Sequence, residues 1–263
     1  MRNIRIELSY EGTDFSGWQR QPDQPTVQGC LEAALKKILR ESVRICASGR
    51  TDAGVHAFRQ VANFKTASVI PSGNLVKALN DVLPPTVRVR KAHEVADDFH
   101  ARYAVRSKTY RYRILQTPVC SPFWERFVWH YPYDLDHGAM AAAARLVVGE
   151  HDFTSFAAAP GGGKEAEAID TPPASQITRS PSNVRTIFSS RILWRPHLSL
   201  LSYEVRGSGF LHHMVRNLVG TLVEIGRGKL TPRDMLRILE ARDRQFAGPT
   251  APAQGLCLMQ VEY

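Results

Sequence analysis

Apolar and polar residues alternate at the start of the chain, and the period then changes. In residues 3–10, isoleucine or leucine alternates with charged or polar residues, which is typical of a half-buried β-strand. After Thr26 the apolar residues recur at helical spacing as far as Leu39. This second pattern predicts an amphipathic helix with Thr26 as its N-cap.

The same kinds of element continue along the chain in an order that occurs twice. The first half is predicted to contain strands 3–10, 44–47, 55–64 and 87–95, a helix after Thr26, and a helix from Ser72 that Pro84-Pro85 ends. This β-α-β-β-α-β order is the split βαβ arrangement of ferredoxin-like domains. The second half is predicted to contain strands 109–115, 127–131, 187–194, 198–206 and 255–263, and helices from Asp134 or Asp136 through Val148, which Gly149 terminates, over 211–225 and over 232–241.

These elements predict an α+β fold made of two tandem ferredoxin-like subdomains, residues 1–104 and 105–263. We expect the subdomains to share a mixed, mostly antiparallel sheet with helices on one side and a cleft between the halves. Residues 157–183 interrupt the second copy, because they are rich in Gly, Pro, Ser and Thr and contain almost nothing to bury. We expect a flexible surface insertion there.

Charge is the unusual feature of the composition. The chain has 34 Lys and Arg against 25 Asp and Glu, a net charge of +9 with a pI near 9.6. Such a balance favours a polyanionic partner, above all nucleic acid, through the release of counterions. The four cysteines are scattered and are expected to be reduced thiols, and no apolar run approaches the length of a membrane span. Charged residues also interrupt any signal-peptide core at the N-terminus, so we expect a cytoplasmic protein.

Residues 48–58 concentrate chemically active side chains between two apolar, strand-like runs. Gly49 and Gly54 allow the backbone to turn sharply and leave Asp52 at the tip. Arg50 can pair with this carboxylate or bind an anionic ligand. An ordinary strand-loop-strand turn, whose aspartate caps its own backbone, explains the local residues equally well.

Two further segments combine polar and aromatic residues in a regular pattern. On the helix 211–225, His212, Arg216 and Gly220 share the face opposite the apolar one, which is either a solvated face or a means of directing Arg216 toward a carboxylate or phosphate. In the strand 109–115, Tyr110 lies among basic residues and is either a core tyrosine or a platform for stacking an RNA base. The adjacent His212 and His213 should point apart on a helix, no histidine has the spacing of a zinc site, and no nucleotide-binding fingerprint is present, so no metal or cofactor is expected.

Several blocks along the whole chain resemble the TruA family of tRNA pseudouridine synthases, in the order in which they occur in that family. The blocks are residues 10–19 (YEGTDFSGWQ), 49–57 (GRTDAGVHA), 99–102 (FHAR), 108–112 (KTYRY), 209–217 (GFLHHMVRN), 251–253 (APA) and 255–258 (GLCL). Residues 157–183 depart from the resemblance, since they form a longer segment than the family leads us to expect.

The resemblance implies a role for four residues. Asp52 would be the catalytic nucleophile, Arg216 would pair with it, Tyr110 would stack on the target uracil, and Arg50 would assist extrusion of the nucleotide. The implied reaction isomerises uridine to pseudouridine at positions 38, 39 and 40 of the tRNA anticodon stem-loop. It implies a homodimer that works without cofactor or metal.

General chemistry agrees with these roles. A uridine within a duplex must be flipped out of the stack, and stacking on Tyr110 would return ~1–3 kcal/mol of that cost. A paired Arg216 would keep Asp52 ionised and ready to attack. One carboxylate suffices because uracil can leave as a delocalised anion, and attack at C1′, attack at C6 or removal of the C2′ proton all fit. The alternatives are a non-catalytic tRNA-binding or tRNA-folding module, and an RNA glycosylase or nuclease.

Overall fold

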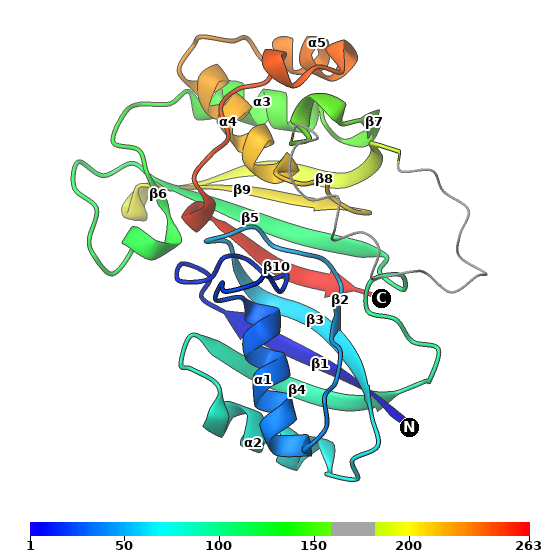
Figure 1. Ribbon diagram of the computed structural model, residues 1–263. Helices are drawn as coiled ribbons and strands as arrows, with labels where there is room; N and C mark the ends of the chain where they lie inside the picture. The colour runs from blue at the N-terminus through cyan, green and yellow to red at the C-terminus, as the bar shows by residue number, and fades with distance from the viewer. Residues whose placement is uncertain (159–181) are drawn as a thin grey trace. The chain divides into compact units, whose positions relative to one another are not determined.

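The computed structural model describes residues 1–158 and 182–263 (Figure 1). The predicted insertion at 157–183 therefore lies almost entirely outside the described residues. The chain divides into two compact units: unit 1 is Met1–Lys108 with Leu256–Tyr263, and unit 2 is Thr109–Gly255. The sequence places the boundary after residue 104 and leaves the last strand in the second half, whereas in the structure this strand belongs to unit 1.

Unit 1 is built on a sheet whose strands are close to those expected from the sequence. Its elements are β1 (Arg2–Tyr10), α1 (Val27–Leu39), β2 (Cys46–Ala47), β3 (His56–Thr66), α2 (Ser72–Val82), β4 (Val87–Val95) and β10 (Leu256–Glu262). The strand β1 lies antiparallel between β3 and β4, and β2 pairs antiparallel with β3. On the other side of β3, β10 pairs in parallel, with Cys257 opposite His56.

Both helices of unit 1 begin and end for local reasons. The hydroxyl of Thr26 accepts a hydrogen bond of 3.2 Å from the backbone N–H of Gly29, which confirms the predicted N-cap of α1. The helix ends at Arg40, whose φ of 59° is in the left-handed region. The second helix begins at Ser72, as predicted, and stops before Leu83, because the prolines that follow cannot continue it.

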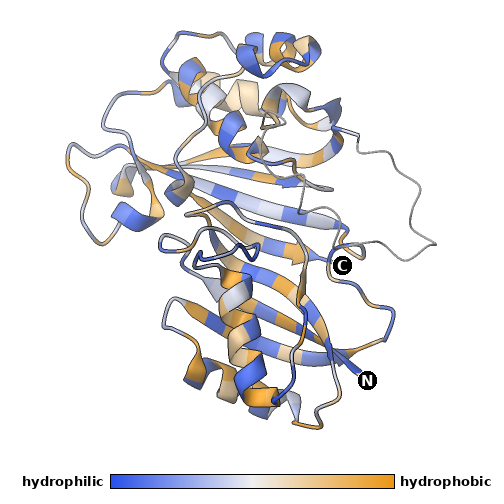
Figure 2. Cartoon of the chain, in the orientation of Figure 1, coloured by the Kyte–Doolittle hydropathy of each residue, from blue (hydrophilic) through white to orange (hydrophobic). Residues whose placement is uncertain are grey.

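The core of unit 1 lies between its sheet and its helices. Alternate residues of β1 point into this core, and Figure 2 shows the corresponding bands of hydrophobic and hydrophilic residues along β1 and β3. The most buried apolar side chains of these elements are Ile4, Ile6, Leu8, Phe64, Leu31, Leu35, Leu75 and Leu79. Each contributes about 1.5–3 kcal/mol on burial, so the alternating pattern accounts for the register of β1.

Unit 2 has the same two kinds of layer. Its elements are β5 (Ser107–Leu115), of which residues 109–115 belong to unit 2, β6 (Trp129–His130), α3 (His137–Arg145), β7 (Gly149–Asp152), β8 (Val184–Arg195), β9 (Leu200–Gly207), α4 (Met214–Gly226) and α5 (Asp234–Ala241). The strands β5, β9, β8 and β7 are neighbours in that order, and β6 pairs in parallel with β5. The helix α3 packs on β8, and α4 packs on α3.

The structure differs from the sequence-based prediction at several places in unit 2. The predicted strand 127–131 is a 3-10 helix, Glu125–Phe127, followed by the two residues of β6. The helix expected from Asp134 or Asp136 through Val148 is shorter, because Asp136 caps it and it ends after Arg145. The edge strand β7 was not expected, since its residues are mostly polar. The α+β class, with strands of mixed and mostly antiparallel direction, is confirmed.

Within residues 1–158 and 182–263, none of the helices combines the length and the apolar character that crossing a bilayer requires.

Candidate active site

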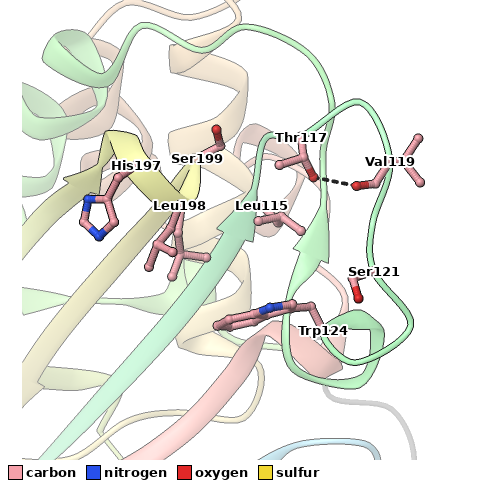
Figure 3. A pocket seen from close by; sticks show the side chains of 9 residues that line it. Leu115, Thr117, Val119, Ser121, Trp124, His197, Leu198 and Ser199 are labelled. Carbon is pink, nitrogen blue, oxygen red and sulfur yellow. Dashed lines mark hydrogen bonds between the residues drawn. The ribbon is translucent and has the colours of Figure 1, made fainter.

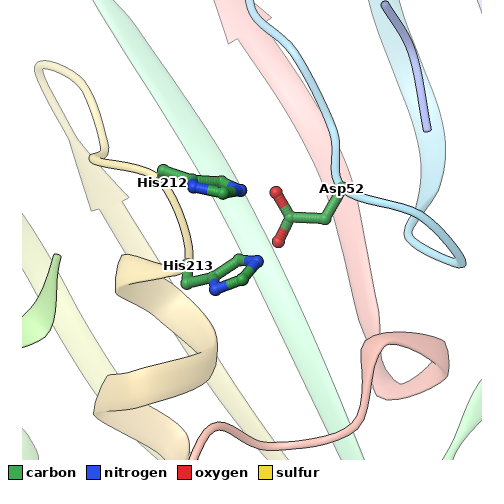
Figure 4. Close-up of side chains that lie close together, drawn as sticks. All are labelled: Asp52, His212 and His213. Atoms are coloured by element: carbon green, nitrogen blue, oxygen red, sulfur yellow. The ribbon is translucent and has the colours of Figure 1, made fainter. Parts of the chain in front are cut away.

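Asp52 lies in a tight turn just before β3. The backbone N–H of Val55 donates to the carbonyl of Asp52 at 3.1 Å, and Gly54 has a φ of 77°, which glycine adopts without strain. Asp52, which Figure 4 labels on the loop before β3, belongs to unit 1 and is half-buried. This geometry is the sharp turn expected from the motif, although of its two glycines Gly54 has a positive φ and Gly49 does not.

The loop that follows β1 holds this turn through direct backbone contacts. The N–H of Trp18 donates to the carbonyl of Thr51 at 3.0 Å. A Cβ on Gly17, whose φ is 93°, would lie 2.8 Å from the Thr51 oxygen, and a Cβ on Gly12 would lie 2.0 Å from the Val55 oxygen. Both glycines therefore allow two backbones to approach more closely than any side chain permits.

A set of buried polar side chains forms hydrogen bonds with the residues of the turn. The hydroxyls of Tyr10 and Thr51 are 2.8 Å apart, and Gln60 donates through Nε2 to the carbonyl of Gly49 at 2.9 Å. Ser48 donates to Oε1 of Gln60 at 2.5 Å. Burial raises the pKa of the Tyr10 phenol well above its usual value, so this hydroxyl stays protonated. The network holds Gly49 and Thr51, the two neighbours of Arg50, through side chains that carry no charge.

His56, the first residue of β3, adds a further anchor. The backbone N–H of Gly12 donates to its Nδ1 at 2.9 Å, so this nitrogen is unprotonated. A carboxylate oxygen of Glu11 lies 3.5 Å from the same nitrogen, and because Nδ1 already accepts a hydrogen bond, we interpret this approach as packing and not as an ion pair. His56 thus positions the turn and is only 5% exposed.

Two cationic side chains belong to the turn region of unit 1. Arg50, predicted as a site residue, is exposed. Lys108, which the sequence did not single out, lies beside the turn, because a Cβ on Gly49 would be 2.6 Å from its Nζ. Its place beside the turn is known from the tertiary structure, because 59 positions separate Lys108 from Gly49 along the chain.

Tyr110 is on β5 in unit 2 and is 8% exposed. Its ring meets that of Phe210 edge to face, with 5.0 Å between the ring centres and an angle of 80°. Such pairs have a preferred geometry, so Phe210 holds the Tyr110 ring in one orientation. Phe210 was missed as a candidate, although it stands inside the resembling block 209–217.

Arg216 is in the first turn of α4, where its side chain is half-buried. Its Nε donates to the carbonyl of Ala251 at 2.7 Å. The neighbouring carbonyl, that of Pro252, accepts a hydrogen bond of 2.7 Å from the hydroxyl of Tyr112. Burial raises the pKa of Tyr112 well above its usual value, and the charge of Arg216 opposes that rise only in part.

The prediction that His212 and His213 point apart is wrong. The helix α4 begins at Met214, three residues later than expected, because His213 has a φ of 61° and is its N-cap. The two rings lie 3.9 Å apart between centres at an angle of 38° (Figure 4). Of the three residues on the polar face that the sequence left open as solvated, Gly220 is buried and Arg216 is half-buried, whereas His212 is exposed.

A pocket of about 290 Å³ lies elsewhere in unit 2 (Figure 3). Its walls come from the start of the segment after β5, from Trp124 and from the turn between β8 and β9. The lining residues are Leu115, Thr117, Val119, Ser121, Trp124, His197, Leu198, Ser199 and Leu200. Arg50, Asp52, Tyr110 and Arg216 are not among them, so this pocket does not involve the predicted site residues.

Comparison with known proteins identifies the family. A family model described as tRNA pseudouridine synthase matches residues 8–104 and 143–263. The chain is 48% identical over 263 residues to tRNA pseudouridine synthase A of Solibacter usitatus, with 100% of both chains covered. It is 45% identical over 267 residues to tRNA pseudouridine synthase A of Brevibacillus brevis, again with 100% of both covered. The resemblance found in the motifs is thereby confirmed, and the chain belongs to the tRNA pseudouridine synthase family, whose members are isomerases that convert uridine to pseudouridine.

Proposed function

We propose that this protein isomerises uridine to pseudouridine at positions 38, 39 and 40 of the tRNA anticodon stem-loop, with Asp52 as its nucleophile. The observation that carries the proposal is the construction of the Asp52 turn. Backbone contacts from Trp18 and a buried hydroxyl pair between Tyr10 and Thr51 hold a half-buried carboxylate in one place. Nucleophilic catalysis needs such a fixed geometry, whereas a turn that only connects two strands does not.

The proposed reaction breaks the bond between C1′ and N1 of uridine and forms a bond between C1′ and C5. Asp52 attacks the nucleotide, the C1′–N1 bond breaks, the detached uracil turns, and its C5 bonds to C1′ while the bond to Asp52 breaks and restores the carboxylate. C5 then loses its proton to solvent, and N1 gains one. No electrons are gained or lost overall, so the chemistry requires no redox cofactor. We propose that the protein uses neither a cofactor nor a metal.

The other three predicted residues act on the same nucleotide in this proposal. Tyr110, oriented by Phe210, stacks on the extruded uracil, and Arg216 pairs with Asp52 to keep it ionised. Arg50, which is exposed, assists extrusion of the nucleotide. In this proposal unit 1 supplies the catalytic loop with Asp52 and Arg50, and unit 2 supplies Tyr110 and Arg216.

The partner in this proposal is the anticodon arm of tRNA. A net charge of +9 supports a polyanionic partner, because each phosphate contact releases condensed counterions. We further propose that the protein acts as a homodimer in the cytoplasm, where its substrate is found.

The test replaces the proposed nucleophile and follows the C5 proton. Asp52→Asn and Asp52→Ala should fold and bind tRNA, but should release no tritium from tRNA labelled at C5 of uridine. Asp81→Asn makes the same chemical change on the exposed surface of α2 and should keep full activity. Circular dichroism checks the fold of all three variants. Full tritium release by either Asp52 variant would overturn the proposal.

The same assay separates the rival functions. A tRNA-binding or tRNA-folding module without chemistry would leave the tritium in place even with the unmodified protein. An RNA glycosylase would release free uracil, and a nuclease would cut the strand, whereas isomerisation leaves the tRNA intact. Mapping pseudouridine in the product tests positions 38, 39 and 40 directly.

A further inference from the structure

The guanidinium of Arg216 is bound to an extended segment that follows α5, residues 248–251. We propose that Asn217 and Thr250 are positioning residues, which hold this segment against α4 and thereby fix the orientation of Arg216. The inference rests on the proposed function of Arg216, and it adds two residues to which no role in the reaction has been assigned.

Arg216 and Ala251 contact each other through two hydrogen bonds. The Nε of Arg216 donates to the carbonyl of Ala251 at 2.7 Å, and the backbone N–H of Ala251 donates to the carbonyl of Arg216 at 3.2 Å. A guanidinium is planar and its donors have fixed directions, so a bond at Nε determines how the plane lies. Any shift of Ala251 would therefore turn the charged end of Arg216.

The segment lies directly on the backbone of the helix. A Cβ on Gly220 would be only 1.6 Å from the carbonyl oxygen of Pro249, and a Cβ on Gly248 would be 2.7 Å from the backbone nitrogen of Thr221. The hydroxyl of Thr221 also accepts a hydrogen bond of 2.9 Å from the N–H of Gly248. Contact between two backbones leaves little freedom for the segment to slide along α4.

Asn217 joins this segment to the rest of unit 2. Its side chain is fully buried and donates through Nδ2 to the carbonyl of Phe156 at 2.7 Å. Its Oδ1 accepts from the hydroxyl of Thr250 at 2.6 Å and from Nη2 of Arg244 at 3.2 Å. Arg244 also donates to the hydroxyl of Thr250, at 3.2 Å. The buried side-chain amide of Asn217 thus connects Phe156, Arg244 and Thr250 through hydrogen bonds. Arg244 and Thr250 are also hydrogen-bonded to each other.

Asn217 and Thr250 are the direct neighbours in sequence of Arg216 and Ala251. The hydrogen bond between Arg216 and Ala251 therefore lies next to the hydrogen bond between the side chains of Asn217 and Thr250. Catalytic groups must be held within fractions of an ångström, and a small displacement costs up to about 100-fold in rate. The arrangement is suited to fixing Arg216, which points to an effect on turnover and not on tRNA affinity.

The decisive comparison is Thr250→Val against Thr250→Ser. Valine keeps the shape but loses the hydroxyl that donates to Asn217, whereas serine keeps the hydroxyl. We expect Thr250→Val to lower kcat about tenfold, since the loss of one such bond corresponds to roughly that factor, with KM for tRNA nearly unchanged. Thr250→Ser should restore most of kcat. Asn217→Ala is a less suitable variant, because its buried partners would be left unsatisfied and the chain could fail to fold.

A second background distinguishes positioning from a general loss of structure. Lysine at position 216 has no planar guanidinium to orient, so Thr250→Val should cause no further loss of kcat when added to Arg216→Lys. An equal loss in both backgrounds, or an unchanged kcat for Thr250→Val alone, would overturn the inference. Thermal denaturation of each variant accompanies the kinetics.

Arg216→Ala separates this inference from the proposed function on which it rests. It should lower turnover more than tRNA affinity. If Arg216→Ala kept full activity, the proposed role of Arg216 would fall together with the inference. If Arg216→Ala lost activity while Thr250→Val did not, only the inference would fall.

Discussion

The phenolic oxygen of Tyr10, at the end of β1, lies 2.8 Å from the hydroxyl oxygen of Thr51, the residue before Asp52. Nε2 of Gln60 lies 3.5 Å from the same phenol and 2.9 Å from the carbonyl of Gly49. These contacts connect a central strand of unit 1 to the residues on both sides of Arg50, in the loop that carries Asp52. Because burial keeps Tyr10 protonated, the connection does not change with pH in the neutral range.

Tyr10→Phe should therefore affect both stability and catalysis. The change leaves buried groups of Thr51 and Gln60 without one partner, which costs about 1–2 kcal/mol in the free energy of unfolding. The loosened turn should lower kcat more than it raises KM for tRNA. Urea denaturation and a pseudouridine assay measure the two effects. Tyr133→Phe is the matched control, because that ring is 67% exposed; if both variants behaved alike, the Tyr10 contact would have no special role.

Gly12→Ala should displace the Asp52 turn. The added methyl would lie 2.0 Å from the carbonyl oxygen of Val55, and neither backbone can move without moving the turn. We expect activity to fall by at least tenfold and the free energy of unfolding by about 2–4 kcal/mol. Gly73→Ala is the control, since a Cβ there would have no atom within 4 Å apart from its chain neighbours and the backbone of its own helix, and alanine favours the helix by up to about 1 kcal/mol. Equal activity of the two variants would contradict this account of the loop.

Glu204 of unit 2 makes stability depend on pH. Burial by itself raises the pKa of this carboxyl, but hydrogen bonds from Arg191 and Arg111 outweigh burial and lower the pKa below its usual value. A lowered pKa in the folded state stabilises the protein above the unfolded value of about 4.3, and this contribution is lost as pH falls through the folded value.

Glu204→Gln should consequently destabilise the protein by about 1 kcal/mol at pH 7, a modest effect because Arg191 is 62% exposed at its side chain. The difference from the unmodified protein should shrink as the pH falls below about 4. Urea denaturation at pH 7 and at pH 3.5 measures it. A difference that stayed constant between the two pH values would show that the charge of Glu204 is not responsible.

Affinity for tRNA should fall steeply with salt. The net charge of +9 predicts several phosphate contacts, each of which adds about −0.7 to −0.9 to the slope of log K against log salt. Filter binding or fluorescence anisotropy between 50 and 200 mM salt, about the range over which such losses are large, gives the slope. Asp52→Asn, which removes no cation, should leave this slope unchanged; a flat dependence would argue against recognition through phosphates.

Much of the secondary structure could be predicted because its causes are local. Thr26 and the apolar spacing after it define α1, and the prolines after Leu83 end α2. The strand predicted at 87–95 has the bounds of β4, Val87–Val95. The error at the start of α4 arose because side-chain pattern and backbone conformation disagree there: His212 and His213 continue the helical pattern, yet His213 is in a left-handed conformation and α4 starts after it.

The chain pattern by itself determined that the protein has an α+β fold, that a sharp turn presents Asp52, and, through the resemblance, which family it belongs to. Tertiary structure alone decided that Tyr10 and Gly12 hold this turn, that Lys108 lies beside Gly49, and that Asn217 is a buried connector. It also decided that β10 pairs with β3, where Cys257 is opposite His56. Propensity, spacing and capping act over a few residues and can be read from neighbouring positions, whereas these contacts join distant segments, and their geometry arises only when the chain has packed.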